Sequence, residues 1–518
     1  MADQPVIPDW IKTMTYLQCA WLVLATFTVG SYLYNVYLHP LRKFPGSWTH
    51  RVSRLPWAYH SLRGDLHEHL LRLQRQHGTH VRIAPNELMC SGGTVWKDMY
   101  AAAARGREEI APTHHLLFPS RFDTPHFIVD PDAARRGRIR GALLPSFSER
   151  SMRQYEPTIQ RYLDLFLRRL QENCDGGNRS VNVRDWYNYF AFDVLGQLAF
   201  SSDFQCLENS ELHPWISSMF SDSLFGPVCL SVLVNLGFQM AVDLLYKQLG
   251  ARFRKLRQSA RLKVFERLDS EKPRDDFTEV LLRKLGTDTG TEAILMTGPT
   301  LIFAGSETQA TLLYGLTYLL ITNPAALQKL NGEVRGAFAQ QEDITYTDVS
   351  RLKYLVACIN EGLRCFPSVA NASTRHAPLS GCVINGAFVP GGVRSSLPLA
   401  LLTCRCITQV LHEGVAWLNT QMTGESCSNP LPLVHVTAWA RCEPKFNSPY
   451  PSAFYVHPAT KFRDTRLAHA EIRMVLATVI LNFDMELAEE QPNLLKEMRA
   501  YGVFWSKPDL NLRLKPIK

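Results

Sequence analysis

The clearest pattern along the chain is an apolar run near the N-terminus. Residues 13–37 carry no charged side chain, and roughly 20 apolar residues are enough for one helical crossing of a bilayer. A cleaved signal peptide and a buried core helix are the alternatives. The run is longer than the hydrophobic region of a typical signal peptide, and no small-residue cleavage site precedes the polar segment. We therefore predict a permanent transmembrane anchor at residues 13–38, behind a short tail of residues 1–12.

Charged residues around the anchor predict its orientation. Arg42 and Lys43 follow the apolar run, whereas the tail carries Asp3, Asp9 and Lys12. Positively charged flanks stay on the cytoplasmic side of a membrane. We therefore expect a single-pass membrane protein whose body faces the cytosol.

Behind the anchor, a hinge at residues 39–46 is punctuated by proline and glycine. Beyond it, apolar residues recur three or four positions apart, as on one face of a helix. Strand-like alternation is short, at residues 80–83 and 383–389. With no internal repeat and no linker that divides the body, the pattern predicts one large, mainly α domain with a minor β part over residues 39–518. The clearest helical segments are residues 153–171, 251–268, 276–284 and 323–338.

Composition and charge narrow the possible partners. The chain of 518 residues is 46% hydrophobic and 20% charged, as an ordinary globular protein is. Its net charge of +8 is spread without a basic block, which argues against nucleic-acid binding and favours an anionic membrane surface. The twelve cysteines form no C-x-x-C pair, so no zinc or redox motif is predicted, and a long chain with few cysteines is typical of a reducing compartment.

A group of polar residues interrupts the apolar helix predicted at residues 298–320. Ser306, Glu307, Thr308 and Gln309 stand in the middle of this helix, where buried acids and hydroxyls are costly unless they are paired or used. Gly305 precedes them, and its missing side chain would let a ligand or cofactor approach the backbone. A core helix with one solvated turn explains the same pattern equally well.

Two further groups of charged residues suggest binding or bracing roles. Glu361 and Arg364 are three positions apart among apolar neighbours, so they predict a buried rather than solvated ion pair that fixes geometry more than it stabilises. On its own, however, Glu-x-x-Arg is a common pattern on helix surfaces.

Arginines cluster in the segment PDAARRGRIRGALLPSFSER, at Arg135, Arg136, Arg138 and Arg140. By itself the cluster favours a solvated basic face. The alternative is that one or two guanidinium groups point inward and bind an anionic group such as a carboxylate. Arg375 is a further candidate for this role.

The order of these segments carries a family resemblance. An anchor, HPLRKFPG at residues 39–46, the arginine cluster before ALLPSFSER, AGSET within an apolar helix, and NEGLRCFP follow one another. This series resembles the fungal microsomal cytochromes P-450. The resemblance runs from residue 32 to residue 392 and resumes at residues 435–440 and 466–487.

The resemblance implies a fold, a reaction and partners. It implies the cytochrome P-450 fold and a monooxygenase with haem b, whose iron takes a cysteine thiolate. Such an enzyme hydroxylates or otherwise oxidises a lipophilic small molecule, here in fungal secondary metabolism. It also implies electrons from an NADPH-cytochrome P-450 reductase, a monomer, and the endoplasmic reticulum membrane.

Site residues are implied position by position. Ala304, Gly305, Glu307 and Thr308 match the family's oxygen-activation segment, in which an acid and an alcohol deliver protons to bound dioxygen. Glu361 and Arg364 match the Glu-x-x-Arg pair that braces the haem-side core.

The resemblance also implies anchors for the haem propionates. Arg140 and Arg375 fall where the family places these partners of the cofactor. Arg136 stands where many fungal relatives have histidine.

The resemblance fails at the haem-binding loop. Counting back from Leu467 places the axial position at Phe462, and phenylalanine has no lone pair with which to bind iron. The nearest upstream thiol is Cys442, but no glycine-rich turn surrounds it to support a thiolate. The sequence therefore provides no metal ligand at the expected place.

A second departure is the segment 394–434, which interrupts a family-like β segment with few charges and no periodicity that we can assign. An insertion beside a deleted loop indicates an error in the predicted gene model. One intron was retained, and another was removed together with coding sequence. Three hypotheses follow: a monooxygenase whose true product contains the loop, a catalytically inactive membrane-bound relative that binds a hydrophobic ligand, and an unstable product without function.

Overall fold

The computed structural model of the chain describes residues 9–92, 94–100, 108, 110–112, 130, 132–217, 225–249, 258, 262–269, 276–371, 374–397, 466–489 and 493–517. Phe462, Cys442 and most of the atypical segment 394–434 lie outside these residues. The predicted helix at residues 251–268 also lies largely outside them.

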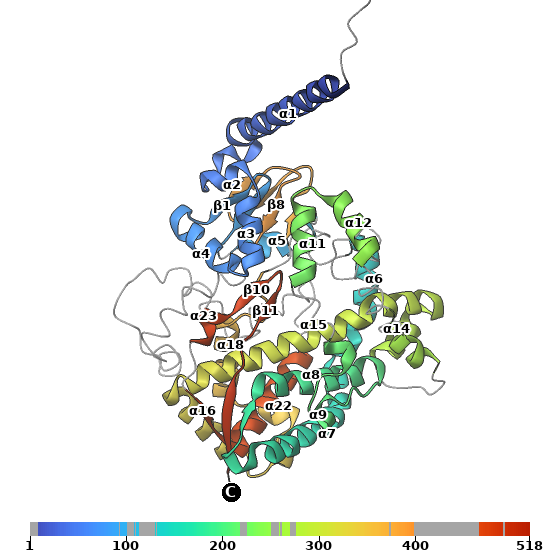
Figure 1. Cartoon of the computed structure of the whole chain (residues 1–518). Coiled ribbons are helices and arrows are strands. Elements are labelled where there is room, and N and C mark those ends of the chain that lie inside the picture. The colour runs from blue at the N-terminus through green and yellow to red at the C-terminus, as the bar shows by residue number, and fades with distance from the viewer. Residues whose placement is uncertain are drawn as a thin grey trace, which may run out of the picture.

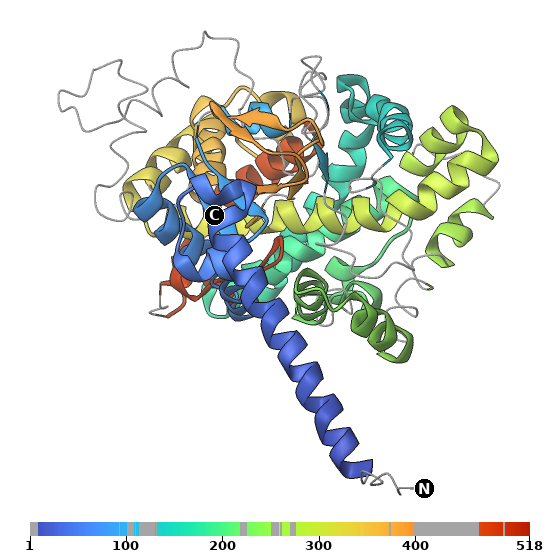
Figure 2. The ribbon, with the colours of Figure 1, turned by 90° about the horizontal axis from the view of Figure 1, so that it is seen from above.

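The N-terminal helix projects from the body of the protein (Figures 1 and 2). Helix α1 (Asp9–Leu33) continues through a π-helical turn, Tyr34–Leu38. Residues Gln18–Leu38 are long and apolar enough to cross a membrane, and none of this span is buried inside the protein. His39 then caps the short helix Pro40–Lys43 by accepting a hydrogen bond from the backbone N–H of Leu41. Within the described residues, this is the one unbroken helix long and apolar enough to span a membrane.

A small sheet and its helices form the part of the body nearest to α1. The sheet has the strand order β1-β2-β8-β5-β3, in which β2 and β8 are parallel and the other pairs antiparallel. Its apolar side packs with α3 (Leu55–Arg63), α4 (Leu66–His77) and α11 (Phe225–Asn235) into one core cluster. The strands are β1 (His80–Ala84), β2 (Glu87–Cys90), β3 (Ala111–Pro112), β5 (Arg375–His376) and β8 (Arg394–Ser396).

Strand β8 is the start of the segment that the sequence marked as atypical. Its three residues lie in the middle of the sheet, between β2 and β5. The first residues after Val393 therefore form regular structure, because their backbone completes the ladder of two neighbouring strands.

The larger part of the body is helical, and the long helix α15 (Thr287–Ile321) runs through its middle (Figure 1). α15 packs on α8 (Val183–Phe200), which is buried on nearly all sides. Other helices around this core are α14 (Phe277–Leu285), α18 (Lys353–Cys365) and α22 (Arg466–Asn482).

The remaining described helices of the body are α2 (Trp48–Val52), α5 (Val95–Tyr100), α6 (Ala133–Leu143), α7 (Glu149–Cys174), α9 (Cys206–Asn209), α12 (Gln239–Leu249), α16 (Pro324–Ala337), α17 (Tyr346–Val349) and α23 (Leu494–Glu497).

Three small antiparallel sheets complete the fold. The hairpin of β10 and β11 lies over α15, where Phe504 packs against Phe303 with ring centroids 5.1 Å apart. The sheets comprise β4 (Ser180–Asn182), β12 (Asn511–Pro516) and β9 (Phe483–Leu487); β6 (Cys382–Ile384) and β7 (Ala387–Val389); and β10 (Arg499–Tyr501) and β11 (Phe504–Ser506).

The prediction of a mainly α fold with a minor β part is confirmed, and so are the helices predicted at 153–171, 276–284 and 323–338. The run at 383–389 differs, because it is the hairpin of β6 and β7 rather than one strand. Asn385 and Gly386 both have positive φ at its turn, as a two-residue Asn-Gly hairpin requires.

Candidate functional site

The polar residues in the middle of α15 form a dry turn, which we call the polar turn (Ser306–Gln309). All four side chains are less than 10% exposed. The interpretation as a solvated turn is therefore wrong, and each polar atom needs a partner within the protein.

Two hydroxyls of the polar turn bond to backbone carbonyls. Ser306 Oγ donates to the carbonyl of Ala191 on α8 over 3.0 Å. Thr308 Oγ1 donates to the carbonyl of Ala304, one turn back on α15, over 2.8 Å. Bonds of this second kind are local alternatives to solvent for threonine inside a helix. They place Ala304 and Thr308 together on one face of α15.

Gly305 lies where α15 packs closely against α8. A Cβ at this position would lie 2.4 Å from Leu195 Cδ1 of α8. The space left by its missing side chain is thus filled by a neighbouring helix. The approach of a ligand or cofactor to the backbone at Gly305 stays a prediction.

Glu307 is held by a partner that the sequence did not suggest. Lys507 Nζ, just beyond β11, donates to Glu307 Oε1 over 2.6 Å and to Thr311 Oγ1 over 2.8 Å. The two charged side chains are only 5% and 4% exposed. The two residues are 200 positions apart in the sequence, so no local sequence pattern could predict that they pair. The second carboxylate oxygen, Oε2, is buried and accepts no hydrogen bond from the described residues.

A second buried acid faces the polar turn from α22. Burial raises the pKa of Glu471 to about 8, and the amide of Gln309 acts in the opposite direction. The carboxyl group is therefore protonated at neutral pH, because an isolated charge there would lose its solvation. The sequence analysis did not single out Glu471.

The predicted pair on α18 forms. Arg364 Nε donates to Glu361 Oε2 over 2.6 Å, and a second guanidinium nitrogen bonds to Oε1. The side chains are 18% and 16% exposed, so the pair is mostly but not fully enclosed. Arg364 also contacts Cys365 Sγ at 3.1 Å. This two-pronged geometry is the strong form of an arginine–carboxylate contact.

The arginines of α6 divide by the direction that they face. Arg138 is exposed, whereas Arg136 and Arg140 are half-buried and one turn apart. Arg135 binds Asp130 through Nε–Oδ2 at 2.5 Å, and Arg136 donates to the backbone carbonyl of Asp130. Arg140 comes from the last turn of the helix, with its Nε enclosed by protein.

Arg375 lies on the sheet rather than on α6. Its guanidinium stands 4.8 Å from the ring centroid of Tyr100 and donates to the carbonyl of Ile110 over 3.4 Å. Burial raises the pKa of Tyr100 to about 12, against the opposing effect of this cation. The structure thus places the predicted site residues on four elements: α15, α18, β5 and α6.

Comparison with known proteins places the chain in a family. The family model of cytochrome P450 matches residues 45–403, more than half of the chain. The chain belongs to the cytochrome P450 family. Its members are haem-dependent monooxygenases, and the match ends within the atypical segment.

Curated relatives of this cytochrome P450 are fungal monooxygenases. The cytochrome P450 monooxygenase tpeC of Talaromyces stipitatus is 32% identical, covering 97% of this chain and 95% of the relative. The averantin hydroxylase of Dothistroma septosporum is 32% identical over 95% and 92% of the two chains. The trichothecene C-15 hydroxylase of Fusarium sporotrichioides is 32% identical over 93% and 95%.

The family cofactor is haem iron. The residues present fit the carboxylates of the haem but not its iron. Arg140 and Arg375 are enclosed cations suited to carboxylates, and the hydroxyl of Thr308 lies on a dry face of α15. The iron ligand does not fit. The position before α22 is Phe462, and among the described residues no group of three or more histidine, cysteine or acidic side chains is arranged to hold a metal.

Burial changes the acidity of several described cysteines. A ligating cysteine must be a thiolate, which needs a lowered pKa. Burial instead raises the pKa of Cys358 to about 12 and of Cys382 to about 11, and it raises those of Cys90, Cys206 and Cys229 as well. Burial thus disfavours the free thiolate form at these five cysteines.

Proposed function

We propose that this cytochrome P450 scaffold serves a monooxygenase that hydroxylates or otherwise oxidises a lipophilic small molecule in fungal secondary metabolism. The observation that carries the proposal is the dry polar turn on α15, which presents Glu307 and Thr308 side by side within a P450 fold. The names of the relatives, two of them hydroxylases, support the reaction class.

The proposal assigns a role to each predicted residue. Ala304, Gly305, Glu307 and Thr308 belong to the catalytic segment, with Gly305 acting through helix packing. The cofactor-binding set is Arg136, Arg140, Arg375, Glu361 and Arg364. The axial cysteine must come from a haem loop that the present sequence replaces with Phe462, so we assign no chemical step to the iron in this chain.

Membrane attachment supports the proposed partner and location. The span Gln18–Leu38 and the following Arg42 and Lys43 favour a body on the cytosolic side of the endoplasmic reticulum. An NADPH-cytochrome P-450 reductase would then supply electrons from the same membrane surface, and the chain would act as a monomer.

A second candidate function is a catalytically inactive, membrane-bound relative that binds a hydrophobic ligand. Phe462 at the position that matches the family's axial cysteine favours it. Sequencing of the mature transcript across the codons for residues 390–470 separates the two. A transcript that encodes a Cys-containing loop supports the monooxygenase, and one that matches the present sequence supports the inactive relative.

The direct test is a reduced carbon monoxide difference spectrum of the full chain supplied with haem. We expect no red-shifted Soret band from this chain, and a clear band from the same chain with the family loop restored. A band from the unaltered chain would show that one of its own cysteines binds the iron, and its loss in Cys442→Ala would identify the residue. Absence of the band from well-folded, loop-restored protein would overturn the monooxygenase.

A further inference from the structure

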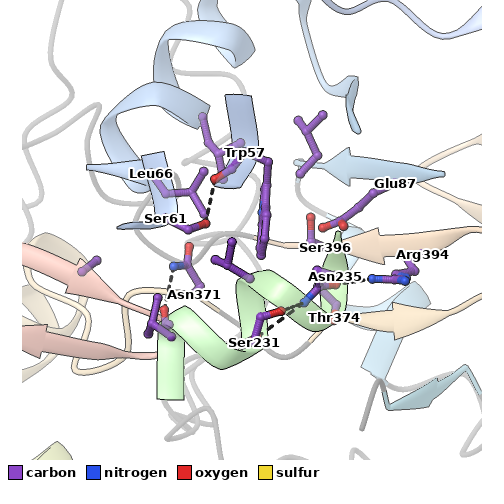
Figure 3. A pocket seen from close by; sticks show the side chains of 16 residues that line it. Trp57, Ser61, Leu66, Glu87, Ser231, Asn235, Asn371, Thr374, Arg394 and Ser396 are labelled. Carbon is purple, nitrogen blue, oxygen red and sulfur yellow. Dashed lines mark hydrogen bonds between the residues drawn. The ribbon is translucent and has the colours of Figure 1, made fainter. Parts of the chain in front are cut away.

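A cavity lies between the small sheet and the helices that cover it (Figure 3). Its volume is about 60 Å³. A water-sized group needs on the order of 10–15 Å³ by this measure, so the cavity has room for a small polar head and the first carbons of a larger ligand. The hairpin of β10 and β11 forms part of its wall through Ala500 and Gly502.

One wall of the cavity is apolar and the other is polar. Trp57 and Leu66 stand at the apolar side, and Arg394 and Asn235 stand at the polar side (Figure 3). Such division suits a ligand with an apolar body and one polar end. The apolar wall is Trp57, Leu66, Leu70, Ile83, Val228 and Val232.

The charges at the polar wall do not cancel. Glu87 is already bound by Arg54 through Oε2–Nη1 at 2.6 Å, with both side chains less than 10% exposed. Arg394 instead donates to the neutral amide oxygen of Asn235. Among the described residues, no carboxylate lies within ion-pair distance of Arg394. The cluster of Arg54, Glu87 and Arg394 thus encloses one net positive charge.

Arg394 is half-buried, and the partial loss of hydration makes its charge costly. Burial lowers the pKa of Arg394, and the nearby cation Arg54 lowers it further, while Glu87 acts in the opposite direction. A buried cation without a counter-ion is stabilised when an anion arrives with matching hydrogen-bond geometry. Arg394 uses one donor on Asn235, so it keeps donors for a second partner.

A hydroxyl beside Arg394 also lacks a partner. Ser396 is 7% exposed, and its Oγ makes no hydrogen bond within the described residues. Both residues lie on β8 and both line the cavity. Across the cavity, Asn371 donates from Nδ2 to the carbonyl of Gly502 over 2.8 Å, while its Oδ1 remains a buried acceptor.

We propose that this cavity binds the carboxylate head of a lipophilic acid, with Arg394 and Ser396 as donors to the carboxylate and the Trp57 side as the wall for its apolar body. The inference rests on the proposed function in so far as it names the substrate class of that monooxygenase. A neutral head group would fill the same space but would leave the charge of Arg394 unpaired.

The test compares ligands that differ only in charge. Octanoate and octanamide have the same shape, and both are titrated into the full chain in detergent by isothermal titration calorimetry without haem. We expect octanoate to bind at least about tenfold more tightly than octanamide, because a charge-assisted pair replaces a neutral one. Equal affinities, or no binding of octanoate, would overturn the proposal.

Variants locate the effect. Arg394→Gln should abolish the preference for octanoate, and Arg394→Lys should retain part of it. Arg153→Gln changes an arginine whose side chain is 67% exposed on α7, and it should leave the preference intact. A folded Arg394→Gln protein that still prefers octanoate would disprove the role of Arg394, and thermal unfolding of each variant establishes that it is folded.

The outcome does not depend on the haem experiment. Calorimetry measures an acid binding to the polypeptide, whereas the carbon monoxide spectrum measures ligation of iron. A preference for octanoate without a Soret band supports an acid-binding relative without catalysis. A restored band without that preference supports the monooxygenase and rejects the acid as its substrate class.

Discussion

The polar turn of α15 and the polar wall of the cavity both hold charged side chains away from bulk water, but they balance those charges differently. In the polar turn, the carboxylate of Glu307 meets the ammonium group of Lys507 at 2.6 Å. At the cavity, Glu87 is bound by Arg54 and Arg394 keeps only a neutral partner. The first charge has its counter-ion within the protein, although Glu307 Oε2 accepts no hydrogen bond from the described residues, whereas Arg394 has no counter-ion among those residues.

This contrast separates a charged pair that positions side chains, Glu307 with Lys507, from a charged group suited to binding a ligand, Arg394. A buried ion pair holds both of its side chains in one geometry. A buried charge that lacks a counter-ion costs stability until a ligand binds, so its presence suggests a binding role. Substitutions at Lys507 and Arg394 separate these two cases by their effect on stability. Substitutions at Glu471 and Gly305 test the surroundings of the polar turn.

The largest effect is expected at Lys507. Lys507→Met leaves the carboxylate of Glu307 buried without its cation, and we expect the free energy of unfolding to fall by about 3–5 kcal/mol. Urea denaturation of the full chain in detergent measures this change. The double variant Glu307→Gln with Lys507→Met should recover most of the loss, because it removes both charges.

Lys515→Met is the matched control for this variant. Lys515 pairs with Glu486, but both side chains are about half exposed. Exposed pairs contribute about 0–1 kcal/mol, so stability should change little. A loss as large as that of Lys507→Met would mean that the comparison of buried and exposed pairs fails.

Glu471→Gln should stabilise the protein at neutral pH. The folded-state pKa of about 8 lies above the value in an unfolded chain. The wild-type carboxyl group therefore contributes stability that is complete at low pH and is lost as the pH rises toward 8. The neutral amide removes that loss, and we expect a gain of about 2–3 kcal/mol at pH 7.

The pH profile distinguishes this cause from simple repacking. Unfolding temperatures of wild type and Glu471→Gln should converge near pH 4 and diverge up to pH 8. A constant difference across this range would show that Glu471 does not titrate in the folded protein.

Gly305→Ala tests how closely α8 and α15 pack beside the polar turn. The added Cβ would meet Leu195 Cδ1 at 2.4 Å, and overpacking of this kind costs about 1–3 kcal/mol. Leu195→Ala in the same chain should relieve part of the cost. Gly336→Ala on α16 meets nothing within 4 Å and should stabilise by about 0.5–1 kcal/mol. Similar effects at the two glycines in thermal unfolding would reject the packing role.

The smallest effect on stability is expected at Arg394. Arg394→Gln removes a buried charge without an ionic partner, so the loss of its bond to Asn235 and the relief of desolvation oppose each other. We expect a net change within about 1 kcal/mol by urea denaturation. A loss comparable to that of Lys507→Met would show that Arg394 is a structural cation rather than a free binding group.

Several features of the fold followed from local sequence patterns. Apolar spacing predicted α7, α14 and α16, because a helix buries one face at every third or fourth residue. The Glu361–Arg364 pair was predictable for the same reason, since both partners lie on one helix turn. The order of motifs predicted the family. The phenylalanine at position 462, where the family has its axial cysteine, indicated that the iron ligand is missing.

Only the tertiary structure decided the partners that come from distant segments. Lys507 reaches Glu307 because the hairpin of β10 and β11 returns over α15, and Gly305 faces Leu195 because α8 crosses there. Arg394 came from a segment that looked foreign, yet β8 places it in a cavity beside α11. Periodicity determines which face of a helix or strand is buried, but the chain topology decides what that face meets.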